Sequence, residues 1–477
     1  MTKTVRNLQF VGLAQLLSIG LVQLGYLILA RMLTPDDFGL YAAVMIVFNL
    51  CVTVSTVGLD LAAVQSKDES EELLRTAATF RMTMAIIAVI AALILAPVTA
   101  SFFGISEMTD PLRVITLAIL ISSAGFVSTV RLTKALRFRE LSISRIGYAV
   151  TWPAVAVLAG VIGFTYWSMI VASLFANVIA LALLWIYAPW RISFHIDKTV
   201  LAKLLHYGKF PVATGVVVFL FFNLDKVVVG RLLGAELLGL YFMAYTWGTM
   251  VPGIFTNIVN SVMFPTYSSI SHDTGMLSKG YLKTLTYLGY ISLPMGFGLA
   301  AISPTFIGAL LGAKWTAAAG PLAVLSLVGT CSALTSPAGS LFLATGNPNL
   351  SWRQTAVTVA IYAVLLVPAV IVGGILAVSI LMLAIVTVSL VWVQHMASGL
   401  VGESLKTLWG SLWRPALAAI VMSAIVYCAS TFMEAQIIPL VGLILLGIGV
   451  YGAIVYALNR KTMKDEVRSL MQLFLGR

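Results

Sequence analysis

Two charged residues interrupt an apolar stretch near the middle of the chain. A run of valine, leucine and phenylalanine leads through Asn223 to Asp225 and Lys226, and three valines follow. A charge at the centre of a bilayer costs roughly 2.5–3.5 kcal/mol on insertion scales, so such residues usually pair or serve a function. Four interpretations stay open: a salt bridge to the first half of the chain, a proton site on Asp225, contact with a substrate head group, or a buried ion pair that locks the register of the bundle.

Two arginines occupy matching positions in a repeated segment. Residues 31–41 (RMLTPDDFGLY) recur as residues 231–241 (RLLGAELLGLY), at an offset of 200 residues. The guanidinium group of arginine suits the bidentate geometry of a phosphate better than a lysine does. Arg31 and Arg231 are therefore candidates for the basic groups of an anion-binding cavity. The alternative is that both extend to the membrane interface and cap helix ends.

Other polar residues lie within or beside apolar runs. Asp60 and Asn260 align at the same offset of 200. They are candidates for ion coupling or gating, and hydrogen bonding between helices is the alternative. Arg353 begins an apolar run, where it would either meet an incoming anion or anchor the helix at the interface. The four histidines and three cysteines show no metal-ligand spacing, so neither a metal site nor a cofactor is predicted.

The composition indicates the surroundings of these residues. Hydrophobic residues make up 60% of the 477-residue chain and charged residues 10%, whereas soluble domains average about a quarter charged. Runs of about 20 apolar residues, the length that spans a bilayer core of about 30 Å, recur along almost the whole chain. We therefore predict an all-α integral membrane protein, because helices satisfy their backbone hydrogen bonds within the bilayer.

The apolar runs predict fourteen transmembrane helices. They are centred on residues 10–30, 40–64, 78–101, 113–133, 143–163, 166–187, 208–229, 240–265, 284–311, 319–344, 355–372, 374–396, 412–432 and 438–458. The two tightest joins, at residues 163–166 and 372–374, rest on length, since a single helix of about 40 residues would overrun the bilayer.

The basic residues predict the orientation of these helices. In this scheme all 29 lysines and arginines fall on one side of the membrane except Arg31, Arg113, Lys226, Arg231 and Lys314. Because basic residues accumulate in cytoplasmic loops, both termini are expected in the cytoplasm. This bias and contact with anionic membrane lipids explain the formal net charge of +11, so no nucleic-acid partner is predicted.

The repeat predicts the domain organisation. Six predicted helices separate the two copies, so both copies face the same way, as parallel repeats about an axis along the membrane normal do. We expect a six-helix bundle at residues 1–189, a basic cytoplasmic linker at 190–207, a second six-helix bundle at 208–397, two extra helices at 410–459 and a basic cytoplasmic tail at 460–477.

The same segments resemble those of a known family. The motifs are residues 33–42 (LTPDDFGLYA), residues 223–241 (NLDKVVVGRLLGAELLGLY), Phe264-Pro265 and residues 344–347 (ATGN). They resemble the bacterial polysaccharide transporter family, which includes O-antigen and exopolysaccharide flippases of the multidrug, oligosaccharidyl-lipid and polysaccharide exporter superfamily. The resemblance covers essentially the whole chain, and its motifs point to the family without naming a sugar.

The resemblance implies two six-helix bundles in a V that opens alternately to either side of the bacterial inner membrane. It implies an oligosaccharide on undecaprenyl diphosphate as substrate, for lipopolysaccharide or exopolysaccharide assembly, with polymerase and glycosyltransferase machinery as partners. Such a substrate needs a water-filled basic cavity with a lateral opening for its lipid. Arg31, Arg231, Lys226, Arg353 and Asn223 are the candidates for lining that cavity, and Asp225, Asp60 and Asn260 are those for ion coupling or gating.

Two other function classes fit the sequence less well. A multidrug and toxin extrusion antiporter of related architecture would use acidic residues in its core for cations, and Asp60 and Asp225 are the main intramembrane acids. An enzyme such as a membrane polymerase would present catalytic residues in large external loops, which the predicted loops lack. The chain has no G-x-x-x-x-G-K-[ST] phosphate loop, so an ion gradient or consumption of the product is expected to drive transport.

Overall fold

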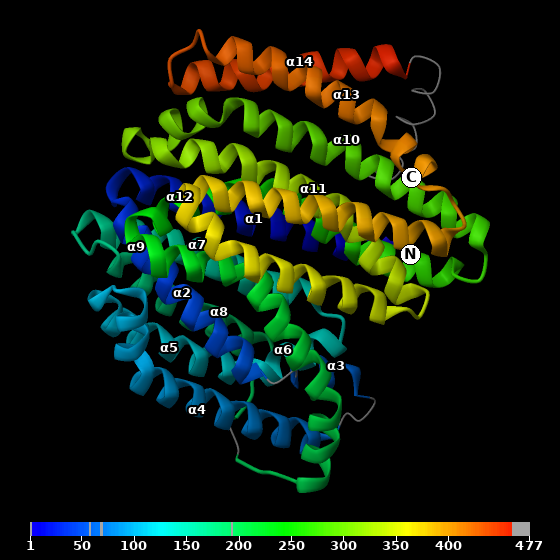
Figure 1. The fold of residues 1–477 in the computed structure, drawn as a ribbon. Coiled ribbons are helices and arrows are strands. Elements are labelled where there is room, and N and C mark those ends of the chain that lie inside the picture. The colour runs from blue at the N-terminus through cyan, green and yellow to red at the C-terminus, as the bar shows by residue number, and fades with distance from the viewer. Residues whose placement is uncertain (1, 57–58, 67–69, 192–193, 460–477) are drawn as a thin grey trace. The chain divides into compact units, whose positions relative to one another are not determined.

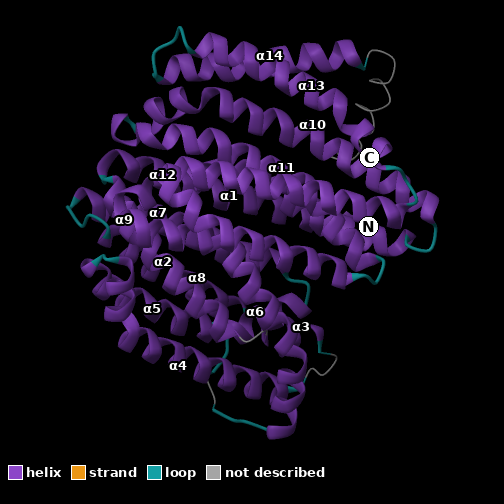
Figure 2. Cartoon of the chain, in the orientation of Figure 1, coloured by secondary structure: helices purple, strands orange, loops and turns teal. Residues whose placement is uncertain are grey.

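The structure is a computed structural model that describes residues 2–56, 59–66, 70–191 and 194–459. The side chains of residues 2–9, 61, 65, 203–214, 216, 251–252, 254–258 and 260–261 lie outside the described part. The described residues form helices joined by short loops, with no strand among them (Figure 1, Figure 2). The predicted all-helical fold is therefore confirmed.

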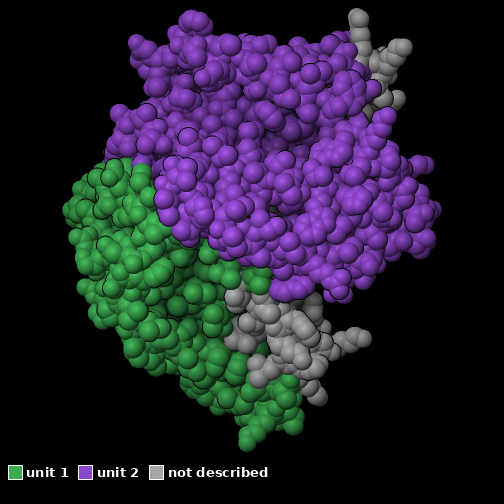
Figure 3. All heavy atoms as spheres, in the orientation of Figure 1, with its two compact units in different colours: residues 1–239 green, residues 240–477 purple. Residues whose placement is uncertain are grey.

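The helices group into two compact units, residues 1–239 and residues 240–477 (Figure 3). The dividing point lies within α9 (Lys198–Ile270), the longest helix of the described part. The predicted organisation, two six-helix bundles joined by a linker at residues 190–207, stays a prediction.

Unit 1 is built around the contacts of α7. In chain order it contains α1 (Thr2–Met32), α2 (Pro35–Thr56), α3 (Leu59–Gln65), α4 (Glu71–Phe103), the 3-10 turn η1 (Ser106–Met108), α5 (Thr109–Ala124), α6 (Phe126–Lys134), α7 (Phe138–Val161), α8 (Trp167–Tyr187) and the first part of α9. Helix α7 packs against both α1 and α8, and α4 packs against α5 and α2. The buried Trp152 of α7 donates a hydrogen bond from Nε1 to Ser173 Oγ of α8 at 3.0 Å, and its ring lies 4.8 Å from that of Tyr26 in α1. One tryptophan thus joins three helices.

Unit 2 is held together partly by a buried polar network. After the rest of α9 it contains α10 (Thr274–Phe306), the π-helical turn η2 (Ile307–Leu311), η3 (Ala313–Ala318), α11 (Ala319–Ala344), α12 (Pro348–Val401), α13 (Leu405–Ser430) and α14 (Ile437–Leu458). The hydroxyl of Tyr281 in α10 donates to Gln394 Oε1 in α12 at 2.9 Å, and Gln394 Nε2 donates to the backbone oxygen of Leu334 in α11 at 3.0 Å. These bonds link three helices inside the core.

Two long helices are broken at glycines. In α9, Gly234 has non-helical angles (φ 85°, ψ −177°), and in α12 the break lies at Gly373 (φ −149°, ψ 21°) and Gly374 (φ 58°, ψ −145°). Only glycine adopts such positive φ values readily. A straight helix of the 54 residues of α12 would extend about 81 Å at 1.5 Å per residue, far beyond a bilayer core. The break in α12 therefore divides it into two segments of about membrane-spanning length.

Eleven helices of the described part are long and apolar enough to cross a membrane, or twelve if the bent pair Ser106–Ala124 and Phe126–Lys134 forms one span. The predicted multi-pass membrane protein is confirmed, whereas the count of fourteen helices is not. The break at Gly373 and Gly374 coincides with the predicted join at residues 372–374. Gly234 lies between the predicted helices that end at residue 229 and begin at residue 240.

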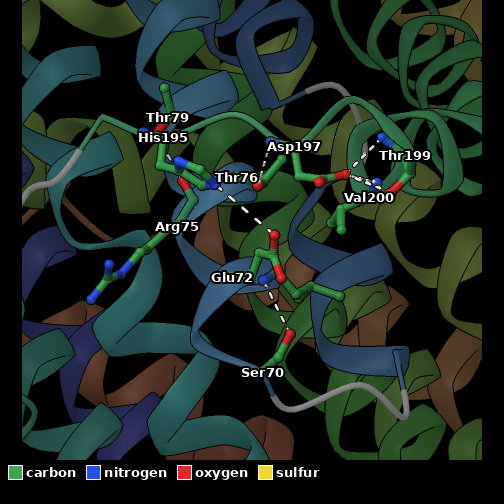
Figure 4. Close-up of polar contacts among 10 residues, drawn as sticks. Ser70, Glu72, Arg75, Thr76, Thr79, His195, Asp197, Thr199 and Val200 are labelled. Carbon is green, nitrogen blue, oxygen red and sulfur yellow. Dashed lines mark hydrogen bonds and ion pairs between the residues drawn. The ribbon is translucent and has the colours of Figure 1, made fainter.

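The segment that leads into α9 is attached to α4 (Figure 4). The backbone N–H of His195 donates a hydrogen bond to Thr79 Oγ1 at 2.9 Å, and that of Asp197 donates to Thr76 Oγ1 at 3.1 Å. Asp197 in turn caps α9, because its Oδ1 accepts the backbone N–H of Thr199 at 2.7 Å and its hydroxyl at 2.5 Å. The hydrogen bond from the Thr199 side chain lowers the pKa of the Asp197 carboxyl group.

Candidate functional site

The two charges predicted in the apolar stretch lie together in the first part of α9. Asp225 is fully buried and Lys226 is 6% exposed. The Nζ atom of Lys226 lies 3.8 Å from Oδ1 of Asp225 and donates a hydrogen bond to the backbone oxygen of Phe222, one turn earlier. Oδ1 of Asp225 also accepts the backbone N–H of Lys226 at 2.8 Å. The two charges therefore compensate each other within one helix.

The two copies of the repeated segment contact each other within unit 1. A Cβ atom added to Gly39 would lie 1.7 Å from the backbone oxygen of Ala235, and one added to Gly239 would lie 1.8 Å from the backbone oxygen of Pro35. Residues 35 and 235 hold equivalent positions in the repeat, as do residues 39 and 239. The contact is therefore reciprocal, with each copy supplying one glycine and one carbonyl group.

This contact places the repeated arginines at one end of unit 1. Arg31 lies four positions before Pro35, and Arg231 lies four positions before Ala235, the two residues whose carbonyl groups make the contact. Both arginine side chains are exposed. The guanidinium carbon of Arg231 lies 5.6 Å from the centre of the Phe102 ring, within the range in which a cation and an aromatic face attract each other. The role of both arginines in anion binding stays a prediction.

Acidic residues share this end of unit 1 with the arginines. Asp36 and Glu236 are exposed and interact electrostatically with each other. Asp37 begins α2 through a reciprocal cap: its Oδ2 accepts the N–H and the hydroxyl of Thr34 at 2.9 and 2.7 Å, and Thr34 Oγ1 accepts the N–H of Asp37 at 3.2 Å. The end thus carries both signs of charge, which suits a diphosphate less well than a uniformly basic site.

Asp60 of α3 pairs with an arginine that the sequence did not single out. Nη1 of Arg81 in α4 donates a hydrogen bond to Oδ1 of Asp60. Arg81 is 8% exposed, and its guanidinium carbon lies 5.1 Å from the centre of the Phe126 ring in α6. The pair is an interhelical polar contact, the alternative considered for Asp60. The available signal was an arginine ten positions inside an apolar helix that begins at Glu71.

The remaining predicted residues are not brought into one site by the described contacts. Asn223 is half-buried, and its Nδ2 donates to the backbone oxygen of Phe219, one turn earlier, at 2.9 Å. Arg353 is exposed near the start of α12. The side chain of Asn260 lies outside the described part. Among the described residues, no group of three or more His, Cys, Asp or Glu side chains is placed to hold a metal ion.

Unit 2 contains an apolar pocket of about 370 Å³ that the sequence did not reveal. It lies between α10, α11, α12 and α13. Its apolar lining is Leu293, Phe297, Leu327, Leu334, Leu383, Leu390, Trp409, Leu412, Trp413 and Ala416. Thr330, Cys331 and Thr387 also line it. The volume falls in the range of about 300–1,000 Å³ common for ligand sites, and the lining suits an apolar chain better than a sugar.

Comparison with known proteins points to polysaccharide synthesis. A family model described as "Polysaccharide biosynthesis protein" matches residues 28–320, more than half of the chain. The chain is 25% identical to the lipopolysaccharide biosynthesis protein WzxC of Escherichia coli (strain K12), over 91% of this chain and 89% of that protein. It is 27% identical to the teichuronic acid biosynthesis protein TuaB of Bacillus subtilis (strain 168), over 80% and 79%. It is 26% identical to the succinoglycan biosynthesis transport protein ExoT of Rhizobium meliloti (strain 1021), over 68% and 66%.

Solved structures of transporters share the fold. The lipid II flippase MurJ, in an inward closed conformation, matches with a TM-score of 0.80 at 14% identity, over 95% of this chain and 99% of that one. An inward-facing multidrug resistance transporter of the MATE family and MOP superfamily matches with a TM-score of 0.60 at 15% identity, over 81% and 96%. At such identities the likeness concerns the fold alone.

Proposed function

Because the chain belongs to the polysaccharide biosynthesis protein family, we propose that it is a flippase that moves undecaprenyl-diphosphate-linked oligosaccharide across the cytoplasmic membrane by alternating access. The observation that carries this proposal is the extent of the two likenesses. A flippase fold covers 95% of the chain, and a relative named for lipopolysaccharide biosynthesis covers 91% of it. The product would serve surface polysaccharide or exopolysaccharide assembly, with membrane lipids, polymerases and glycosyltransferases as partners.

The chemistry of the substrate divides the proposed site into two parts. The diphosphate and sugars are anionic and polar, so we assign their binding to Arg31, Arg231, Lys226, Arg353 and Asn223. The prenyl chain is apolar, and the leucine- and tryptophan-lined pocket of unit 2 has room for part of such a chain. Arginine at two of these positions favours a phosphate group over a neutral sugar, because the guanidinium fork matches its oxygens.

The buried pair in α9 offers a way to couple transport to protons. Asp225 and Lys226 lie side by side and are both buried, so protonation of the carboxylate would remove the negative charge beside the lysine. An incoming diphosphate would supply a negative charge in its place. Asp225 would then act as the coupling group, with Asp60 and Asn260 as further candidates for coupling or gating.

The positions of the basic residues support an orientation with both termini in the cytoplasm. In this proposal residues 1–189 and 208–397 form the two moving bundles, residues 190–207 link them, and residues 410–459 add two helices. The basic tail at residues 460–477 would then lie in the cytoplasm.

An ion-coupled multidrug and toxin extrusion antiporter is the alternative, since a transporter of that kind shares the fold. The two intramembrane acids argue against it. Asp60 is paired with Arg81 and Asp225 with Lys226, so each carboxylate that would attract a cationic drug already has a cationic neighbour. Movement of an intact glycolipid breaks no covalent bond, so the proposal includes no enzymatic activity.

Lipid analysis of a deletion strain tests the proposed function. We expect undecaprenyl-diphosphate oligosaccharide to accumulate on the cytoplasmic side while surface polysaccharide disappears, and the accumulated sugars would identify the substrate. A glycolipid that reaches the periplasm normally, in a strain that has become sensitive to cationic drugs, would instead establish the antiporter.

A further inference from the structure

The reciprocal contact between the two repeat copies leaves no room for side chains. We call its four residues, Pro35, Gly39, Ala235 and Gly239, the glycine clasp. A Cβ atom on Gly39 would also approach the carbonyl carbon of Ala235 to 2.5 Å, and one on Gly239 would approach the backbone nitrogen of Gly39 to 2.8 Å. These neighbours are backbone atoms, which cannot rotate away as a flexible side chain would. Any residue larger than glycine would therefore force the two segments apart.

The clasp is held by weak backbone contacts. In each glycine a Cα–H bond takes the direction that a Cβ atom would take, so it points at the carbonyl oxygen of the other copy. Such Cα–H to oxygen contacts recur where membrane helices pack through small residues. At the two glycines themselves only backbone atoms meet, whereas the neighbouring Phe38 and Leu238 are fully buried and would become more exposed if the two segments separated.

Each half of the clasp follows a joint in the backbone. Helix α1 ends at Met32 and α2 begins at Pro35, so a short connection precedes the first half. The break at Gly234 directly precedes the second half, and unit 2 begins directly after Gly239. Each half can therefore tilt together with the helix that follows it, since the change of direction is taken up at the joint.

The rim of the clasp is charged. Arg31, Asp36, Arg231 and Glu236 flank it, and all four are exposed. Separation of the two halves would bring these charged groups into contact with more water, which is favourable.

We propose that the glycine clasp is the outer gate of the transporter, closed in this structure and opened once in each transport cycle. The inference rests on the proposed function, because alternating access is what requires such a gate. The distribution of lysine and arginine assigns this end to the periplasmic side, where the head group would leave. Where two backbones are in van der Waals contact no sugar can pass, so release there requires the clasp to separate.

A reversible cross-link tests whether the clasp must open. With Cys51 and Cys428 changed to serine and the pocket-lining Cys331 kept, Asp36→Cys and Glu236→Cys place one thiol on each half of the clasp. Oxidation is expected to join them and to reduce polymer export at least tenfold, and reduction is expected to restore export. Each variant with only one of the two new cysteines, treated in the same way, is the control and should keep its export. Full export by the cross-linked protein would show that the clasp is a permanent joint and would overturn the proposal.

Spin labels on the same two cysteines test the geometry without any transport assay. In the purified full-length protein, Gly39→Ala and Gly239→Ala should each reduce the population with the short label-to-label distance, to a similar extent because the contact is reciprocal. Gly20→Ala in α1 is the matched control, since its added Cβ meets no atom within 4 Å. Distances that stay unchanged in both clasp variants would overturn the proposal.

The two experiments separate this inference from the proposed function. The spin-label distances require no substrate, so they report on the clasp whether or not a deletion strain accumulates glycolipid. Normal glycolipid transport in the deletion strain would refute the proposed flippase function. Label-to-label distances that do not change in the Gly39→Ala and Gly239→Ala variants would refute only the proposed role of the clasp.

Discussion

Asp60 and Asp225 are the main acids predicted within the membrane, and each lies beside a cation, but the two pairs are built differently. Asp60 and Arg81 come from separate helices, and the Asp60 side chain is 56% exposed. Asp225 and Lys226 are neighbours in one helix and are both buried. The Asp60–Arg81 pair joins two helices, whereas the Asp225–Lys226 contact lies between adjacent residues of one helix. From this difference we propose that Asp60 and Arg81 hold α3 to α4, and that the buried Asp225 and Lys226 are the stronger candidates for coupling.

The largest expected effect comes from breaking the buried pair. Lys226→Met removes the cation beside the buried Asp225 carboxylate, and removing one partner of a buried ion pair typically costs about 3–5 kcal/mol. We expect little protein in the membrane and no polymer export. The double variant Asp225→Asn, Lys226→Met removes both charges, so it should restore the protein level but not export. Export by the double variant would show that the pair serves no function and would remove the contrast with Asp60.

The exposed arginines should affect transport without affecting stability. Arg31→Ala and Arg231→Ala each remove a guanidinium group from an exposed position, so we expect export to fall at least tenfold with unchanged protein levels in the membrane. Arg31→Lys and Arg231→Lys keep the charge but lose the fork, and should give intermediate export. Export and membrane protein would be measured side by side by polymer staining and immunoblotting. Wild-type export by both alanine variants would remove Arg31 and Arg231 from the proposed site and leave Asp225 and Lys226 as its charged residues in α9.

The interhelical pair should show the opposite pattern. Arg81→Ala removes a charge-assisted hydrogen bond and a contact with Phe126, so we expect a loss of about 1–3 kcal/mol, seen as a lower melting temperature in detergent. Export should fall only in proportion to the protein level. Asp60→Asn keeps an oxygen acceptor for Arg81 and is expected to export normally. If Asp60→Asn abolished export at a normal protein level, Asp60 would be a coupling group and the comparison would fail.

The smallest effect is expected at Asp197, a carboxylate outside the membrane that caps a helix. Its pKa is lowered in the folded protein, so the cap contributes its stability at pH values above the ordinary carboxyl pKa of about 3.9. That contribution is lost as the pH falls through the lower, folded-state pKa. At neutral pH, Asp197→Ala should speed hydrogen exchange at the Thr199 amide severalfold while export is unchanged. Equal exchange in both proteins would show that the cap is not formed.

The sequence predicts the helices better than it predicts which side chains of different helices contact each other. The helical membrane fold and the join near Gly373 follow from hydropathy and length, which are local properties. The partner of Asp60 could not be predicted, because Arg81 lies 21 positions further along the chain and in a different helix. The pocket of unit 2 is lined by residues of four helices, and no spacing along one helix indicates it. Gly39 and Gly239 belong to the recognised repeat, yet their mutual contact depends on a tertiary arrangement.

The reciprocity of the glycine clasp bears on the origin of the chain. Pro35 of the first copy meets Gly239 of the second, and Ala235 of the second copy meets Gly39 of the first. Such a reciprocal contact is the isologous contact of a twofold homodimer. An ancestor with one copy of the repeat would have made it between two identical chains, so a single codon would have specified both glycines. After duplication and fusion the two codons could change separately. Position 35 is now proline in one copy and alanine in the other, whereas both clasp glycines are still present.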